Sequence, residues 1–99
     1  MVKRKIIWSD YAKKGFVEIL EYYFIRNGNK KYSTKFRNQI KSAIDLLMTQ
    51  PFLGKKSDFE NVRCLVESNY LIFYSPEEES IEIKLIWDSR RNPEDIKFE

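Results

Sequence analysis

The stretch that decides the fold is Ile81-Glu82-Ile83-Lys84-Leu85-Ile86-Trp87, which leads into Asp88-Ser89-Arg90-Arg91-Asn92-Pro93. The first part alternates apolar and other residues, as the two-residue period of a β-strand requires. We expect one core to receive every second side chain of this strand: Ile81, Ile83, Leu85 and Trp87. The second part is a loop with two arginines, closed by proline. Guanidinium groups bind phosphate or carboxylate through two parallel hydrogen bonds, so this loop is a candidate anion-binding site.

Two more strands are expected upstream of this stretch. The runs Asn61 to Val66 and Tyr70 to Ser75 are rich in Val, Ile, Leu, Phe and Tyr. Turn residues separate the three runs, Ser68-Asn69 first and Pro76-Glu77-Glu78-Glu79 second. Short connections of this kind predict an antiparallel meander. The segment Gly54 to Asp58 is expected to be a polar loop that enters it.

Two helices and a short strand are predicted in the first half. Lys5 to Trp8 reads as a strand, and Ser9-Asp10 provides an N-cap hydroxyl followed by an acidic residue. Apolar residues then recur at spacings of three and four up to about Arg26, and Gly28 suits the left-handed position that ends a helix. A second helix is expected from about Lys30 to Thr49. It has an apolar face and an opposite face with these basic residues: Lys30, Lys31, Lys35, Arg37 and Lys41.

The order of elements predicts an α+β fold. We expect one domain over residues 1–99, with the order β-α-α-β-β-β, in which a helical hairpin packs on one face of a small antiparallel sheet. The first strand is expected to pair within the same sheet. A fold class of this kind does not by itself identify a function.

Composition excludes several classes of function. The chain has 99 residues, 42% of them hydrophobic, which is sufficient for one packed core. It contains no histidine, so zinc sites and histidine acid–base chemistry are not expected, and neither is any metal or cofactor. The single cysteine, Cys64, is expected to be an inert thiol within a strand. Without a long apolar run or a signal-peptide pattern, we expect a cytoplasmic protein that does not associate with membranes.

The net charge of +3 is unevenly distributed along the chain. Residues 1–63 contain 14 Lys or Arg and 6 Asp or Glu, a balance of +8. Residues 64–99 contain 4 and 9, a balance of −5. A basic half can attract nucleic acid or an acidic protein segment, whereas two halves that meet in the fold would partly cancel.

Several local patterns resemble the RelE/ParE superfamily, the toxins of bacterial type II toxin–antitoxin modules. The order of elements is similar over essentially the whole chain. The fragments that match are Trp8-Ser9-Asp10-Tyr11-Ala12, Pro51-Phe52-Leu53-Gly54, Asn61-Val62-Arg63, Tyr70-Leu71-Ile72-Phe73-Tyr74 and Trp87-Asp88-Ser89-Arg90-Arg91-Asn92-Pro93. The resemblance implies a growth-inhibiting toxin that a cognate antitoxin, its protein partner, neutralises.

The resemblance leaves two targets open. RelE-like members are ribonucleases that cut mRNA on the ribosome, and they place basic residues along the meander strands. This chain has Val62, Cys64 and Leu71 at such positions. RelE-like members also often have a Tyr or His near the C-terminus, whereas this chain has neither after Trp87. A nuclease would have to use Glu60, Glu67 or Tyr70 as its general base. The ending Arg-x-x-Pro is more similar to ParE-like members, which poison DNA gyrase and need no intrinsic catalysis. We therefore expect a ParE-like toxin, with a ribosome-dependent endonuclease and a non-toxic homologue that still binds antitoxin as the alternatives.

The candidate site residues follow from this comparison. The basic side chains expected to bind a target or a phosphate are Arg63, Arg90, Arg91, Lys55 and Lys56. If the protein is a nuclease, the three arginines are the candidate catalytic residues. Arg63 would lie on an open sheet face near the arginine loop if the helices cover the side of Cys64. In the simpler interpretation, one arginine of the loop pairs with Asp88, Glu94 or Asp95 and Arg63 is an ordinary strand residue.

Overall fold

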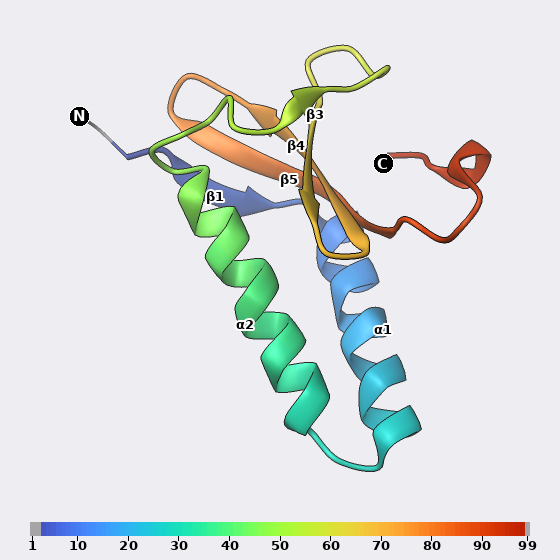
Figure 1. Ribbon diagram of the computed structural model, residues 1–99. Helices are drawn as coiled ribbons and strands as arrows, with labels where there is room; N and C mark the ends of the chain where they lie inside the picture. The colour runs from blue at the N-terminus through green and yellow to red at the C-terminus, as the bar shows by residue number, and fades with distance from the viewer. Residues whose placement is uncertain (1–2, 99) are drawn as a thin grey trace.

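Two helices lie beneath one face of a small twisted sheet in the computed structural model, which describes residues 3–98 (Figure 1). The helices project well beyond the sheet, joined at their far end by a short loop. The elements in chain order are β1 (Lys5–Trp8), α1 (Asp10–Asn27), α2 (Lys31–Leu46), β2 (Lys55–Lys56), β3 (Arg63–Glu67), β4 (Tyr70–Pro76), β5 (Ser80–Asp88) and the 3₁₀ turn η1 (Pro93–Asp95). The predicted α+β fold is confirmed, and so is the predicted order of helices and strands apart from the additional short strand β2.

The sheet is mixed, which corrects the prediction of an antiparallel sheet. Its strand order is β1-β5-β4-β3-β2. β3, β4 and β5 form the predicted antiparallel meander, but β1 pairs with β5 in parallel, with Lys5 opposite Ser80. The chain reaches this parallel register because the whole helical hairpin connects β1 to the rest of the sheet. The predicted polar loop is also partly wrong, since Lys55–Lys56 pairs with β3 as a short edge strand.

Local signals in the sequence account for the ends of both helices. The Ser9 hydroxyl accepts a hydrogen bond from the Ala12 N–H at 3.0 Å, so it caps α1 as predicted. Gly28 ends α1 in the left-handed conformation, with φ of 71°. α2 ends three residues before the predicted Thr49, because residues 47–49 form tight i→i−3 hydrogen bonds ahead of Pro51.

A β-bulge in β5 changes which side chains share a face of the sheet. Phe73 lies opposite Leu85, but the next residue of β4, Tyr74, lies opposite Ile83, so Lys84 is an extra residue in β5. An extra residue shifts every later side chain of the strand to the opposite face. The prediction that one core receives all four odd-numbered residues of this strand is therefore wrong.

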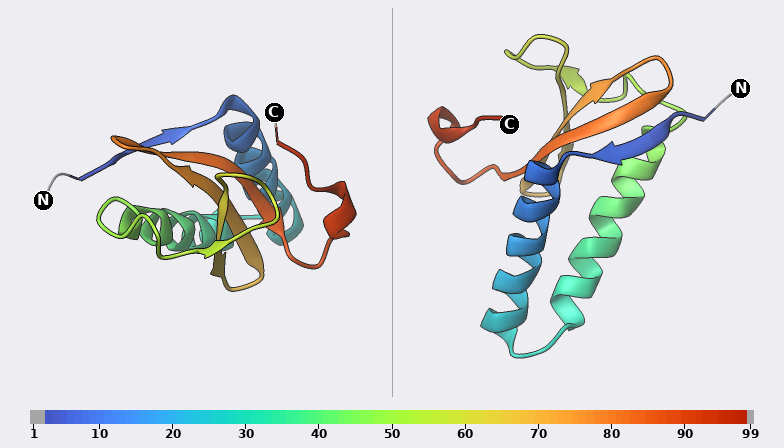
Figure 2. Two further views of the ribbon diagram at one scale, coloured as in Figure 1. Left: turned by 90° about the horizontal axis from the view of Figure 1, so that it is seen from above. Right: turned by 180° about the vertical axis from the view of Figure 1, so that it is seen from behind.

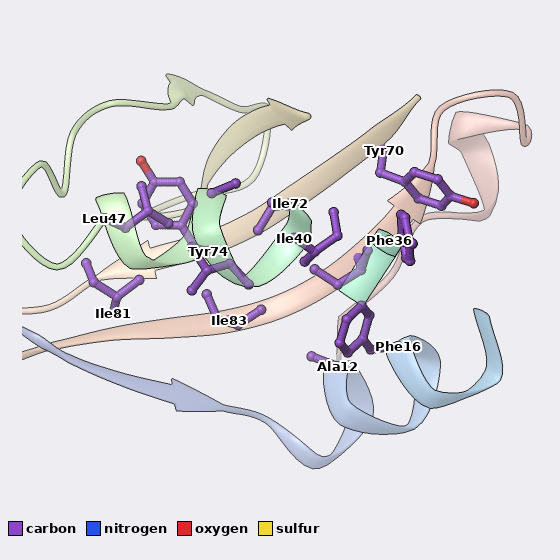
Figure 3. Close-up of a cluster of buried hydrophobic side chains, with 13 residues drawn as sticks. Ala12, Phe16, Phe36, Ile40, Leu47, Tyr70, Ile72, Tyr74, Ile81 and Ile83 are labelled. Atoms are coloured by element: carbon purple, nitrogen blue, oxygen red, sulfur yellow. The ribbon is translucent and has the colours of Figure 1, made fainter. Parts of the chain in front are cut away.

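The apolar residues form one cluster on each face of the sheet. The larger cluster lies between the sheet and the helices (Figure 3), and β5 contributes Ile81, Ile83 and Ile86 to it. The smaller cluster lies on the other face, where Leu85 and Trp87 pack with Phe73. The C-terminal segment turns back over this second face, so that Ile96 and Phe98 contact the smaller cluster (Figure 2).

Tyr74 joins β4 to the loop that follows α2. Its side chain is fully buried, and its hydroxyl donates to the Pro51 carbonyl and accepts from the Gly54 N–H, both at 2.9 Å. Gly54 lies against the neighbouring backbone, because a Cβ at this position would be 2.8 Å from the Cys64 carbonyl oxygen and from the Tyr74 ring. The loop is therefore held against the sheet by the buried Tyr74 hydroxyl and by the close packing of Gly54 against the Cys64 backbone.

Replacing Tyr74 by phenylalanine is expected to destabilise the protein by about 2–4 kcal/mol, because two buried backbone groups would lose their partner. Urea unfolding monitored by circular dichroism measures this free energy. The matched control is Tyr32→Phe, since the Tyr32 ring is 48% exposed and its hydroxyl makes no hydrogen bond within the described residues. Equal stability of the two variants would show that the Tyr74 hydroxyl does not hold the loop.

Gly54→Ala is expected to destabilise the protein by about 1–3 kcal/mol, since the added methyl group would overlap backbone that cannot move freely. A lower melting temperature by calorimetry checks this. Unchanged melting would mean that the loop moves away from Cys64 at no cost, contrary to the buried contacts of Tyr74.

Candidate functional site

The loop after β5 is fixed at both of its ends. The Ser89 N–H donates to the Asn69 carbonyl at 2.8 Å, and the Arg91 N–H donates to the Asp88 carbonyl at 3.0 Å. The Asn92 side chain then caps η1 by accepting from the Glu94 N–H at 3.0 Å. The two arginines are therefore presented by a turn of defined backbone conformation.

Arg90 is neutralised by the carboxylate at the end of its own strand. Its Nε and Nη2 donate to the two carboxylate oxygens of Asp88 at 2.9 and 2.8 Å. This guanidinium, through its hydrogen bonds, holds the pKa of the Asp88 carboxyl below its ordinary value. The simpler interpretation from the sequence, a local pair with Asp88, thus describes Arg90.

Arg91 is held differently and keeps its charge available. Its guanidinium carbon lies 4.3 Å from the centre of the Trp87 ring, and Trp87 itself is buried in the second face of the sheet. Stacking on an aromatic ring orients a guanidinium without neutralising it. Within residues 3–98 no carboxylate lies within ion-pair distance of Arg91. Arg91 is therefore the free cation of the loop.

A tyrosine pair lies next to the Asp88–Arg90 pair. The hydroxyls of Tyr23 on α1 and Tyr70 on β4 are 2.6 Å apart. Burial, and then this hydrogen bond, raise the pKa of Tyr70 far above its ordinary value, so its phenol stays protonated at neutral pH. No local pattern connects Tyr23 with this site, because the two tyrosines are 47 positions apart and Tyr23 belongs to the apolar stripe of α1.

A groove of about 880 Å³ runs between α1 and the chain that leaves β5. Tyr11, Gly15, Glu18 and Tyr22 line its α1 side, and Trp87, Arg91 and Ile96 are among the residues that line the other side. Figure 2 shows the C-terminal segment beside the start of α1. The groove therefore combines aromatic surface, one free guanidinium and several carboxylates.

Arg63 does not lie with the arginine loop. It shares a strand face with Leu65, which packs against the helices, so the expectation that Arg63 lies on an open face near Arg90 and Arg91 is wrong. Its Nε donates to the Gly54 carbonyl at 2.8 Å and its Nη2 to the Phe52 carbonyl at 3.3 Å. Arg63 thus holds the loop that Tyr74 also anchors.

The predicted basic residues fall into two groups at opposite ends of the sheet. Lys55 and Lys56 are exposed on β2, and Lys56 pairs with Arg63. Arg63 is opposite Tyr74 of β4, whereas Asp88, next to the arginine loop, is opposite Tyr70. Four residues of strand separate these positions, a distance of roughly 13 Å. A single phosphate cannot bridge the two groups.

Two classes of site receive no support from the described residues. In residues 3–98, no group of three or more His, Cys, Asp or Glu side chains is placed to hold a metal ion. Neither helix of this part of the chain is long and apolar enough to cross a membrane.

Comparison with a solved structure supports the fold. The structure of the chromosomal ParDE TA system from P. aeruginosa contains a chain that superimposes with a TM-score of 0.74 at 18% sequence identity. The match covers 85% of this chain and 94% of that chain. At this identity the likeness shows a shared fold. No match was found among curated proteins.

Comparison with family models identifies the family. The model for the ParE toxin of the type II toxin–antitoxin system parDE matches residues 6–93, which include both helices, all strands from Ile6 onward and the arginine loop up to Pro93. This match spans most of the chain, and it agrees with the resemblance that the sequence fragments indicated. The chain therefore belongs to the ParE toxin family of type II toxin–antitoxin systems, within the RelE/ParE superfamily.

Proposed function

We propose that this toxin arrests growth by inhibiting DNA gyrase, and that a cognate antitoxin neutralises it in the cytoplasm. Membership of the ParE family sets the class of function. The observation that most supports gyrase over the ribosome is the separation of Arg63 from Arg90 and Arg91 at opposite ends of the sheet.

Cleavage of RNA requires several cations around one phosphate. A ribonuclease built from these residues would need Arg63 and the arginine loop to reach the same phosphate, but roughly 13 Å of strand separates their positions. Two of the three arginines are also already engaged, Arg63 by loop carbonyls and Arg90 by Asp88. Only Arg91 is left to stabilise charge in a transition state.

A general base is also difficult to assign. The raised pKa of Tyr70 keeps it protonated and hydrogen-bonded to Tyr23, which is the wrong state for a base. Glu67 lies opposite Tyr70, at the same end of the sheet as Asp88, but its carboxylate already accepts a hydrogen bond from Gln39 of α2 at 2.9 Å. Glu60 lies in the exposed loop before β3. These positions favour a toxin that acts by binding, which is the ParE-like mode.

The binding surface that we assign to the target is the arginine loop with the adjoining groove. Arg91 stacked on Trp87 is an oriented cation with an aromatic support, and arginine and tryptophan are frequent anchors of protein interfaces. We assign antitoxin binding to the basic outer face of α2 and to the exposed edge strand with Lys55 and Lys56. An acidic partner segment would complement both surfaces.

In a supercoiling assay with purified gyrase, micromolar wild-type toxin is expected to inhibit the enzyme. Arg91→Ala should weaken this inhibition by at least about fivefold, because truncating an anchoring arginine typically costs more than 1 kcal/mol. The matched control is Arg37→Ala, an exposed arginine of α2 outside the groove, which should inhibit as the wild type does.

Three outcomes separate the alternatives. Unchanged supercoiling together with codon-positioned mRNA cuts, mapped by primer extension after induction, would assign the chain to the ribosome-directed nucleases. Normal growth on expression of folded toxin would leave a homologue that only binds antitoxin. Equal loss of inhibition in both arginine variants would show that general positive charge, and not the Arg91–Trp87 contact, binds gyrase.

A further inference from the structure

Gly15 occupies a position in α1 where glycine is unfavourable. The helix spans Asp10–Asn27, so Gly15 lies inside it, in the second turn, and at neither cap. Glycine in a helix interior is less stable than alanine, because it loses more backbone entropy on folding. An isolated glycine inside a helix is tolerated, but it lowers stability relative to alanine.

The described residues give no internal reason for this glycine. Apart from its chain neighbours and the backbone of its own helix, a Cβ built on Gly15 would meet no heavy atom of the described chain within 4 Å, and the residue does not adopt a positive φ. The other two glycines differ, because Gly28 adopts a positive φ and Gly54 lies against the backbone of Cys64. Space for a side chain is therefore available at Gly15 and unused.

The open side of Gly15 faces the groove. Tyr11, Glu18 and Tyr22 lie four, three and seven positions away along α1, so they share one helix face with Gly15, and all of them line the groove. Arg91, supported by Trp87, lines the same groove from the other side. At Gly15 a second chain can approach the helix backbone more closely than any side chain would allow.

We propose that Gly15 is the point of closest approach in a docking groove for a protein segment of the toxin's target, and that this segment brings one carboxylate to Arg91. The proposal rests on gyrase being that target. It specifies that the target contacts the α1 side of the groove. It also assigns a role in binding to Gly15, a residue without a charge or a side chain.

The chemistry of the groove favours a protein segment over nucleic acid. Glu18, Asp88, Glu94 and Asp95 line it together with Lys14, Arg90, Arg91 and Lys97. These opposite charges balance, so the groove has no excess of positive charge to bind a phosphodiester backbone. Tyrosine rings suit peptide surfaces of mixed polarity. Arg91 has no ion pair within residues 3–98, so its guanidinium can bind one acidic side chain of the docked segment.

The test compares Gly15→Ala with Val17→Ala. Val17 lies on the same helix, is 49% exposed and does not line the groove. Alanine has the higher helix propensity at both positions, so both variants should fold. For Gly15→Ala the melting temperature should rise by roughly 2–8 °C. Its affinity for gyrase, measured by surface plasmon resonance, should fall by at least about fivefold, because the added methyl group overfills a close contact. Val17→Ala should retain wild-type affinity.

The remaining outcomes each overturn the proposal in a distinguishable way. A lower melting temperature for Gly15→Ala would reveal an internal role for the glycine. Wild-type affinity in a more stable Gly15→Ala variant would show that nothing docks closely at this position. Loss of antitoxin binding alone, or of binding to a short DNA duplex alone, would assign the groove to that ligand. Wild-type toxin that does not bind gyrase would refute the proposed function itself, and with it this assignment.

Discussion

The extra residue in β5, Lys84, fixes the side of the sheet on which each later side chain of that strand lies. Without the bulge, Leu85 and Trp87 would face the helices and Ile86 would face away. With it, the strand supplies Ile81 and Ile83 to the helix side, then Leu85 and Trp87 to the other side. Both faces of the sheet are covered as a result, one by the helices and one by the C-terminal segment.

The candidate site follows from that change of face. Because Trp87 points away from the helices, its ring supports Arg91 at the edge of the groove. Asp88 then returns to the helix side, where it pairs with Arg90 close to Tyr23 and Tyr70. One strand end therefore presents a neutralised arginine on one face and a free arginine near the other. Arg90 and Arg91 are neighbours in the sequence, but Arg90 is paired with Asp88 whereas Arg91 is stacked on Trp87 and keeps its charge.

Arg63 and Arg91 also differ in whether the guanidinium is already bound within the protein or can still bind a partner. Arg63 is hydrogen-bonded to the Gly54 and Phe52 carbonyls and contacts the Phe52 ring, so it stabilises the loop at the far end of the sheet. Arg91 makes no such contact with backbone carbonyls within the described residues. Charge alone does not identify a binding residue, since the groups that surround each guanidinium decide whether it can reach a partner.

Local physical chemistry was sufficient for much of this protein. The Ser9 cap, the Gly28 terminator and the apolar stripes predict both helices to within a few residues, because these signals act within one or two turns. The meander and the α+β class follow from strand alternation and turn residues in the same way. The arginine loop, with its proline, was recognisable as a candidate site and as a family signature.

Tertiary structure decided what those residues do. The parallel pairing of β1, the bulge at Lys84 and the short strand β2 all depend on sheet register, which is set by contacts between distant segments. Register also determined that Arg63 lies apart from Arg91. The packing of α1 beside the chain that leaves β5 places Gly15 on the groove. The sequence by itself thus determined the elements and the family, because their signals are local. The site was decided only by folding, because it is made of side chains up to 86 positions apart, from Tyr11 to Lys97, whose meeting no local pattern encodes.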